Sequence, residues 1–158
     1  MSTTPYEAPQ ANLDTTPVDA PELWNPRAAI GWSLLFTPAF GAYLHMRNWQ
    51  ALGDQDKAQE SRMWMIGYLI FLLVMLFIPA KAFTAMGSLS RPIGIALLVA
   101  WSRLNAQAQV TTVKERFGTN YPRKSWLLPI VCAIGCMAAL VGVIVAFAAL
   151  TANPGDDY

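Results

Sequence analysis

Long apolar runs alternate with short charged stretches along the 158 residues of this chain. The two clearest runs, residues 63–80 and 126–150, contain no group that is charged at neutral pH. Each reaches the roughly 18 to 20 residues that a helix needs to cross the core of a bilayer. In water, helices that are apolar on every face would have to be buried on all sides, which a chain this short can hardly provide. The pattern therefore predicts an all-α, polytopic helical membrane protein.

The first predicted helix covers residues 26–52 and has a proline at its centre. Asn25 is expected to cap it, with Pro26 at the first helical position, where the missing N–H costs nothing. Pro38 removes one main-chain hydrogen bond and should kink the helix near its middle, which makes this residue a candidate hinge. Gly53 can adopt the left-handed conformation that ends a helix.

The second and fourth helices follow from similar signals. Asp54 can cap a second helix that starts in the aqueous phase, becomes apolar from residue 63 and ends near Pro79. Ser125 can cap the fourth helix, in which Pro129 falls within the first turn, where N–H groups have no helical acceptor. With a third helix between them, we expect about four transmembrane helices arranged as two hairpins.

The third helix has two possible positions. Its apolar core, residues 92–101, covers only about 15 Å at the helical rise per residue. The span either borrows residues 82–89 and buries Arg91, or continues past Arg103 to a stop at Gly118. We prefer the second position, because Arg103 near an interface can extend its charged end into water, whereas an unpaired arginine at mid-bilayer costs several kcal/mol.

Composition divides the chain into three parts. Residues 1–23, rich in Thr, Pro, Ala and acids, predict a disordered acidic tail and do not resemble a signal peptide. Residues 24–152 form the four-helix transmembrane domain, and 153–158 form a short C-terminal tail. Eleven basic residues nearly balance ten acidic ones, without a dense basic cluster, so we expect no nucleic-acid partner.

Basic residues predict the orientation in the bacterial inner membrane. The loops after the first and third helices carry eight of them: Arg47, Lys57, Arg62, Arg103, Lys114, Arg116, Arg123 and Lys124. The tails and the middle loop carry only three: Arg27, Lys81 and Arg91. The positive-inside rule places the eight in the cytoplasm and, for four spans, both termini in the periplasm. Four tryptophans flank the same two loops and are expected to form an interfacial belt: Trp49, Trp64, Trp101 and Trp126.

The sequence contains few residues in patterns typical of catalysis or metal binding. Cys132 and Cys136 lie one helical turn apart, but no further ligand in their span supports a metal or redox site. His45, beside Arg47, has no carboxylate near it in the sequence and is expected to lie at the interface. We therefore predict no enzyme, no catalytic residue and no cofactor. The scarcity of polar groups inside the spans also disfavours a channel or transporter.

The last helix carries small residues suited to contact with another helix. Gly135 pairs with Ala139, and Ala138 with Gly142, at the four-residue spacing that lets membrane helices approach closely. These four residues are our candidate contact face. The partner is either within the chain, a second copy in a homo-oligomer, or another protein.

Two segments of the chain resemble parts of a known group of proteins. LWNPRAAIGWSLLFTPAFGAYLHMRNWQALG and VKERFGTNYPRKSW resemble small inner-membrane proteins of Gram-negative bacteria, especially pseudomonads, over about residues 23–150. Some members of that group are similar to immunity proteins against membrane-acting toxins delivered by type VI secretion. The resemblance implies an immunity protein that neutralises a cognate pore-forming toxin by helix contacts within the bilayer. An accessory subunit of a membrane complex is the alternative, and no site residue comes with the resemblance.

Overall fold

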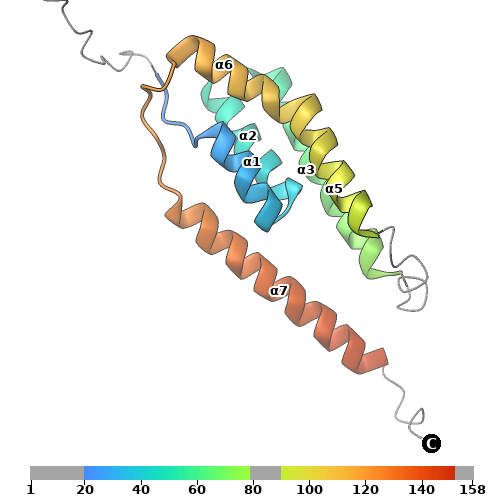
Figure 1. Ribbon diagram of the computed structural model, residues 1–158. Helices are drawn as coiled ribbons and strands as arrows, with labels where there is room; N and C mark the ends of the chain where they lie inside the picture. The colour runs from blue at the N-terminus through green and yellow to red at the C-terminus, as the bar shows by residue number, and fades with distance from the viewer. Residues whose placement is uncertain (1–19, 79–89, 152–158) are drawn as a thin grey trace, which may run out of the picture.

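The computed structural model describes residues 20–78 and 90–151, and within these ranges every regular element is a helix (Figure 1). The expected all-α class is thereby confirmed. The elements in chain order are α1 (Pro26–Leu35), α2 (Pro38–Ala51), α3 (Gln55–Leu76), α5 (Ser90–Trp101), the π-helical turn η1 (Ser102–Ala106), α6 (Gln107–Phe117) and α7 (Leu127–Thr151).

The segment predicted as one kinked span is instead a hairpin of two short antiparallel helices, α1 and α2. Thr37 caps α2 by accepting a hydrogen bond from the Phe40 N–H, and Pro38 occupies the first helical position. The hairpin brings Pro26 beside His45, and Ser33 beside Gly41. Helices of ten and fourteen residues are each too short to cross a bilayer core. The prediction of a kinked transmembrane helix over residues 26–52 is therefore wrong.

Local start and stop signals are confirmed elsewhere. Asn25 accepts hydrogen bonds from the first N–H groups of α1, and Asp54 does so for α3. Gly53 and Gly118 have positive φ angles of 77° and 61°, in a region that other residues rarely enter. The Ser125 hydroxyl accepts a bond from the first N–H of α7.

The predicted helix that continues past Arg103 to a stop at Gly118 is confirmed as a helix, because α5, η1 and α6 form one continuous helical path from Ser90 to Phe117. Its position in a membrane stays a prediction. Arg103 is exposed within this path. The alternative that borrowed residues 82–89 falls largely outside the described residues.

The chain entering α1 runs beside the chain entering α7. The Leu23 N–H donates to the Pro122 carbonyl and the Lys124 N–H donates to the Leu23 carbonyl, both at 3.0 Å, in a short parallel bridge. Leu23 is fully buried with Val113 and Tyr121. The predicted boundary of a disordered tail at residue 23 is therefore wrong, since Leu23 belongs to the core; residues 1–19 lie outside the described part.

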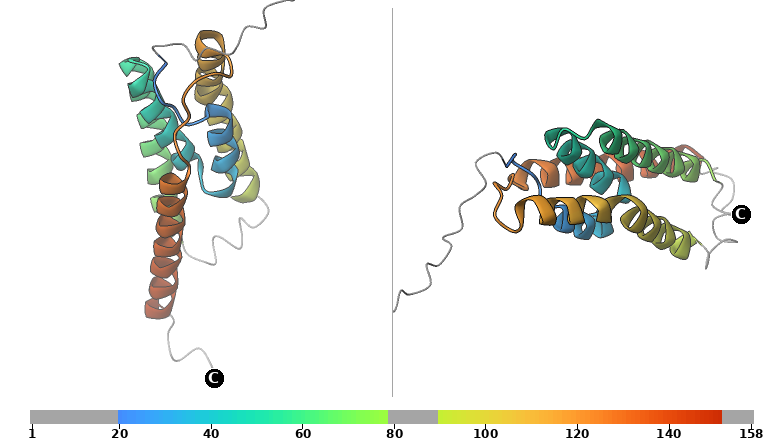
Figure 2. Two further views of the ribbon diagram at one scale, coloured as in Figure 1. Left: turned by 90° about the vertical axis from the view of Figure 1, so that its left-hand side faces the viewer. Right: turned by 90° about the horizontal axis from the view of Figure 1, so that it is seen from above.

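The α2–α3 turn meets the end of α6 and the α6–α7 loop at one end of the molecule. Leu52 packs against the cluster around Leu23, and Arg116 lies beside the turn at Asp54. Most of the lysines and arginines lie at this end, which we call the charged end. In Figure 2 the C-terminal end of α7 lies far from it. The chain around Leu23 thus lies at the same end of the molecule as the basic loops; the predicted periplasmic location of the termini stays a prediction.

Helix α7 stands apart from the other helices (Figure 1). Its segment Leu127–Phe147 is the one stretch, among the residues described, that is long and apolar enough to cross a membrane, and almost none of it is buried against the rest of the chain.

Candidate functional site

A buried polar network joins the hairpin to α6. The side-chain amide of Asn48 accepts from the Trp24 N–H at 3.0 Å and donates to the Trp24 carbonyl at 2.8 Å. The same amide nitrogen donates to Gln109 Oε1 at 3.1 Å, and Gln109 Nε2 donates to the His45 carbonyl at 2.8 Å. Asn48, Gln109 and His45 are all fully buried. Two amides thus hold the start of α1, the end of α2 and α6 in one arrangement.

A second buried contact lies at the π-helical turn. The Ser61 hydroxyl on α3 donates to Asn105 Oδ1 at 3.0 Å, and both side chains are buried. Turns of this kind insert one extra residue into a helix and reorient the side chains around it. Here the turn carries Asn105 and Ala106, the buried residues of that segment. The insertion thus directs the Asn105 amide toward α3, and Gln109, four residues later, contacts α2.

Trp101 and Trp49 are in the core rather than in an interfacial belt. Both are fully buried, so this part of the tryptophan prediction is wrong, whereas Trp64 and Trp126 are partly exposed. His45 is also fully buried instead of interfacial, and its ring meets Trp101 edge-on at 5.4 Å between centroids. The nitrogens His45 Nδ1, Trp49 Nε1 and Trp101 Nε1 have no hydrogen-bond partner among the described residues.

Gly41 permits the closest packing in this core. A Cβ atom at Gly41 would overlap the Ser33 hydroxyl of α1 and the Trp101 ring of α5. Helices approach one another this closely only where one of them lacks a side chain. Gly41 therefore fixes the distance between the two arms of the hairpin and α5.

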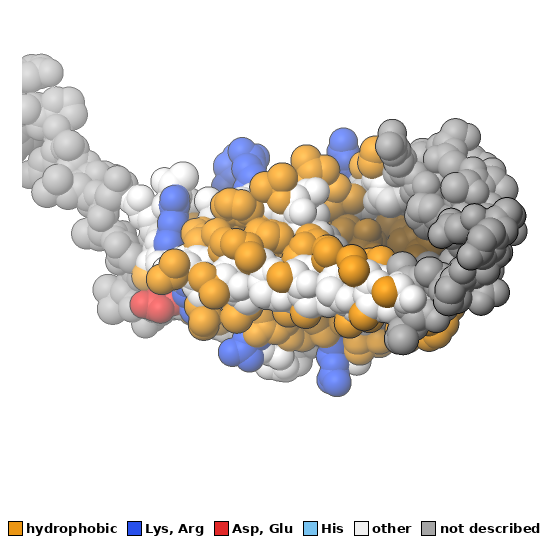
Figure 3. Space-filling model, turned by 90° about the horizontal axis from the view of Figure 1, so that it is seen from below, with side chains coloured by type: hydrophobic (Ala, Val, Ile, Leu, Met, Phe, Trp, Pro, Cys, Tyr) orange, Lys and Arg blue, Asp and Glu red, His pale blue; other side chains and the backbone are white. Residues whose placement is uncertain are grey.

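An apolar groove of about 630 Å³ separates α7 from the hairpin and α3. One wall is α7, with Leu128, Cys132 and Cys136 among its residues. The other wall comes from the hairpin tip, α2 and α3, and includes Phe36, Phe40, Met65, Leu69 and Leu73. Figure 3 views the molecule from the α7 side: apolar side chains cover this face, with Lys and Arg at its margins.

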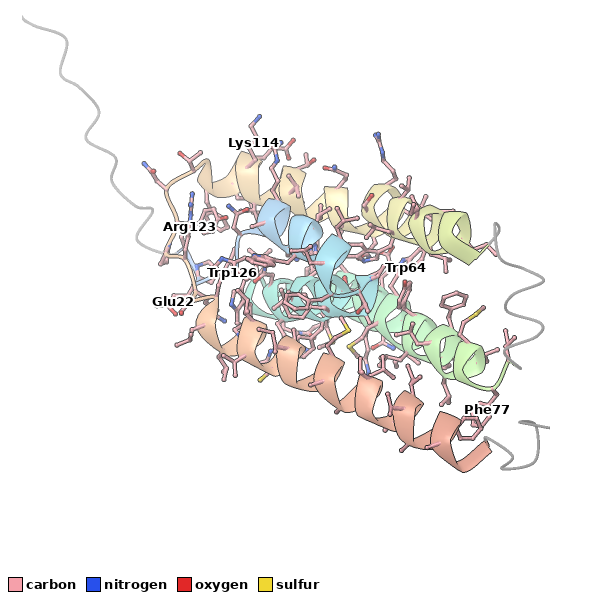
Figure 4. The ribbon with its side chains drawn as sticks, turned by 60° about the horizontal axis from the view of Figure 1, so that its bottom comes forward. Glu22, Trp64, Phe77, Lys114, Arg123 and Trp126 are labelled. Carbon is pink, nitrogen blue, oxygen red and sulfur yellow. The ribbon has the colours of Figure 1, made fainter. Side chains whose placement is uncertain are left out.

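Aromatic and basic residues surround the groove at the charged end. Trp24 lines the groove, and its indole nitrogen donates to the Ser125 carbonyl at 3.0 Å. The Lys124 ammonium lies 4.6 Å from the centre of the Trp24 ring. Figure 4 shows Trp126, Arg123 and Glu22 together at this end, with Phe77 at the other. Within the described residues, the one carboxylate–cation pair is Lys57 with Asp54, so Lys124 has no acidic partner there.

The loop before α7 is braced by aromatic contacts. The Trp126 ring lies 6.3 Å from the ring of Trp32 on α1, and the Arg123 guanidinium lies 5.6 Å from the ring of Tyr121. Burial raises the pKa of the Tyr121 phenol, and the charge of Arg123 opposes this shift. The phenol therefore stays neutral at physiological pH, and the loop is held mainly by packing.

The predicted contact residues of α7 lie away from the groove. Gly135, Ala138, Ala139 and Gly142 are exposed, and none of them lines it. A Cβ atom added at either glycine would meet nothing within 4 Å. The structure thus shows no partner for this face within the described chain. The two cysteines, by contrast, face the groove.

Sequence reasoning missed the polar core. Asn48, Ser61, Asn105 and Gln109 lie near charged helix ends, where polar residues are usually solvated, so their positions gave no signal. Among the residues described, no group of three or more His, Cys, Asp or Glu side chains could hold a metal ion. Comparison with protein-family models, curated proteins and solved structures finds no match.

Proposed function

We propose that this chain is a multi-pass protein of the bacterial inner membrane, in which α3, the continuous helical path from α5 through η1, and α7 cross the bilayer and the α1–α2 hairpin enters it and returns. Support comes from exposed large apolar side chains on every one of these helices, such as Leu34 on α1, Ile70 on α3, Ile95 on α5 and Val141 on α7. Soluble proteins rarely leave such extensive apolar surface in contact with water.

The basic residues favour one orientation. The charged end holds the α2–α3 turn, the end of α6 and the loop before α7, where most of the lysines and arginines lie. The positive-inside rule places this end in the cytoplasm. Because the hairpin returns to the side from which it enters, the N-terminal segment is cytoplasmic in this proposal, and the end of α7 is periplasmic.

The function we propose is immunity: the protein binds a pore-forming toxin within the bilayer and prevents the pore from assembling. One observation carries the proposal, which is that the small-residue face of α7 is exposed while a different face of the same helix lines the groove. Small residues let a foreign helix approach closely, and close packing drives helix association in lipid.

The test is a survival assay with the product of the gene next to this one, directed to the periplasm of a host that makes this protein. Gly142→Leu keeps α7 apolar but blocks close approach, so protection should fall about tenfold or more, as a clash of 1 to 3 kcal/mol would give. Val141→Leu, on another face of α7, is the matched control and should protect fully. Immunoblots of the membrane fraction must show equal amounts of all variants.

Two results would contradict immunity. The first is full protection by Gly142→Leu at normal membrane levels. The second is a neighbouring gene product that does not harm unprotected cells. In either case the alternative, an accessory subunit of a membrane complex using the same face, would gain support.

A further inference from the structure

We infer that the groove between α7 and the hairpin binds one phospholipid of the cytoplasmic leaflet, with its acyl chain along α7 and its phosphate at Lys124. The inference rests on the membrane location proposed above. It concerns a different face of α7 from the proposed toxin contact, so the two can be tested apart.

The length of the groove matches one leaflet. Its α7 wall runs from Leu128 to Leu140, which spans about 18 Å at the helical rise per residue. One leaflet contributes about half of the roughly 30 Å hydrocarbon core. The groove begins beside Trp24 at the charged end and passes the tip of the hairpin at Phe36 and Thr37. It therefore extends from the interface to about the middle of the bilayer.

The shape of the groove suits a flexible chain. Its walls, α7 on one side and the hairpin with α3 on the other, border about 630 Å³. An unbranched acyl chain is thin and flexible enough to follow these walls without moving α7.

The chemistry of the walls agrees with this ligand. Apart from Thr37, the lining residues of the hairpin, α3 and α7 are apolar, aromatic or sulfur-containing. Sulfur atoms come from Met65, Cys132, Cys136 and Met137, and soft, adaptable side chains of this kind suit a ligand without fixed shape.

The positive charge at the groove entrance favours an anionic lipid head group. Lys124 lies over the ring of Trp24, a residue that also lines the groove, so its ammonium is held at the groove entrance. The Trp24 ring is fixed in turn by its bond to the Ser125 carbonyl. Anionic lipids give the cytoplasmic leaflet a negative surface potential, which favours contact with such a cation. The bound lipid should therefore be predominantly anionic.

The experiment is native mass spectrometry of the full-length protein, purified in mild detergent from bacterial membranes and then exposed to phosphatidylglycerol or phosphatidylethanolamine. We expect one retained phospholipid per chain and a preference for phosphatidylglycerol. Ala133→Phe, which fills the groove, should lower lipid occupancy about tenfold, the factor expected for overpacking that costs about 1.4 kcal/mol. Ala138→Phe, on the outward face of the same helix, is the matched control and should keep wild-type occupancy.

A second pair of variants tests the head-group contact. Lys124→Gln should abolish the preference for phosphatidylglycerol while the groove still retains a lipid, and Lys114→Gln on α6 should leave the preference unchanged. Equal occupancy in the wild type and Ala133→Phe would overturn the inference. So would a lipid-free dimer, which would assign the groove to a second copy.

Failure of the lipid site can be distinguished from failure of the proposed function. A protein that fractionates with membranes and protects against the toxin, yet retains no lipid, contradicts only the lipid site. A protein absent from the membrane fraction contradicts the proposed location as well.

Discussion

At the scale of single residues, the interactions that could be predicted were those between near neighbours in the chain. Asn25, Asp54 and Gly118 act as expected, because a cap or a helix stop depends on backbone groups within a few residues. The bond between Asn48 and Gln109 joins residues 61 positions apart. No local pattern distinguishes such an amide from a solvated one, so the polar core had to come from the structure.

The Asn48 amide offers the clearest test at this scale. Asn48→Ala would remove its three hydrogen bonds and leave Gln109 Oε1 and the backbone of Trp24 without these partners. Each buried group left unpaired costs about 1 to 3 kcal/mol, so we expect a loss of about 2 to 4 kcal/mol in the free energy of unfolding.

The measurement is unfolding of the purified protein in mixed micelles, followed by circular dichroism. Gln50→Ala removes an exposed amide from the same helix and should change stability by less than about 0.5 kcal/mol. Similar stabilities for the two variants would show that the network contributes little.

At the scale of elements, the main difference between expectation and structure is the reversal of the chain at Pro38. The Thr37–Pro38 pair repeats the combination of cap and proline at Asn25–Pro26, which was the available sign of a new helix. Locally, a kink and a new start are equally compatible with such a proline. The choice is made by contacts across the hairpin, above all the close approach of Ser33, Gly41 and Trp101.

We expect Gly41→Ala to destabilise the hairpin by about 1 to 3 kcal/mol, because the added methyl group would force α1 and α5 away from α2. Gly67→Ala is a matched control within a helix, since a Cβ atom there meets nothing within 4 Å. Thermal unfolding in detergent, with aggregation monitored by size exclusion, compares the two variants. Equal melting temperatures would show that the close approach is not needed for stability.

At the scale of the whole molecule, the hairpin determines on which side of the membrane the N-terminal segment lies in the proposed arrangement. Counting basic residues predicted which loops are cytoplasmic, but assigning the terminus required knowing whether the first helical segment crosses. The parallel bridge between Leu23 and Arg123 places the two chain segments side by side. A protein that spans the bilayer with this arrangement has three crossings, with its described N-terminal end in the cytoplasm and the end of α7 outside.

Cysteine labelling tests this arrangement in a background where Cys132 and Cys136 are replaced by alanine. Glu22→Cys and Glu115→Cys are both exposed positions at the charged end. With a membrane-impermeant thiol reagent, both should react in inside-out vesicles and neither in intact spheroplasts, because the returning hairpin keeps residue 22 on the cytoplasmic side. Leu35→Cys, at the hairpin tip, should be protected in both preparations at least about tenfold relative to Glu115→Cys, because a thiol in hydrocarbon is shielded from water and reacts poorly as the thiolate. Labelling of Glu22→Cys in spheroplasts would instead indicate that the first helical segment crosses the membrane completely.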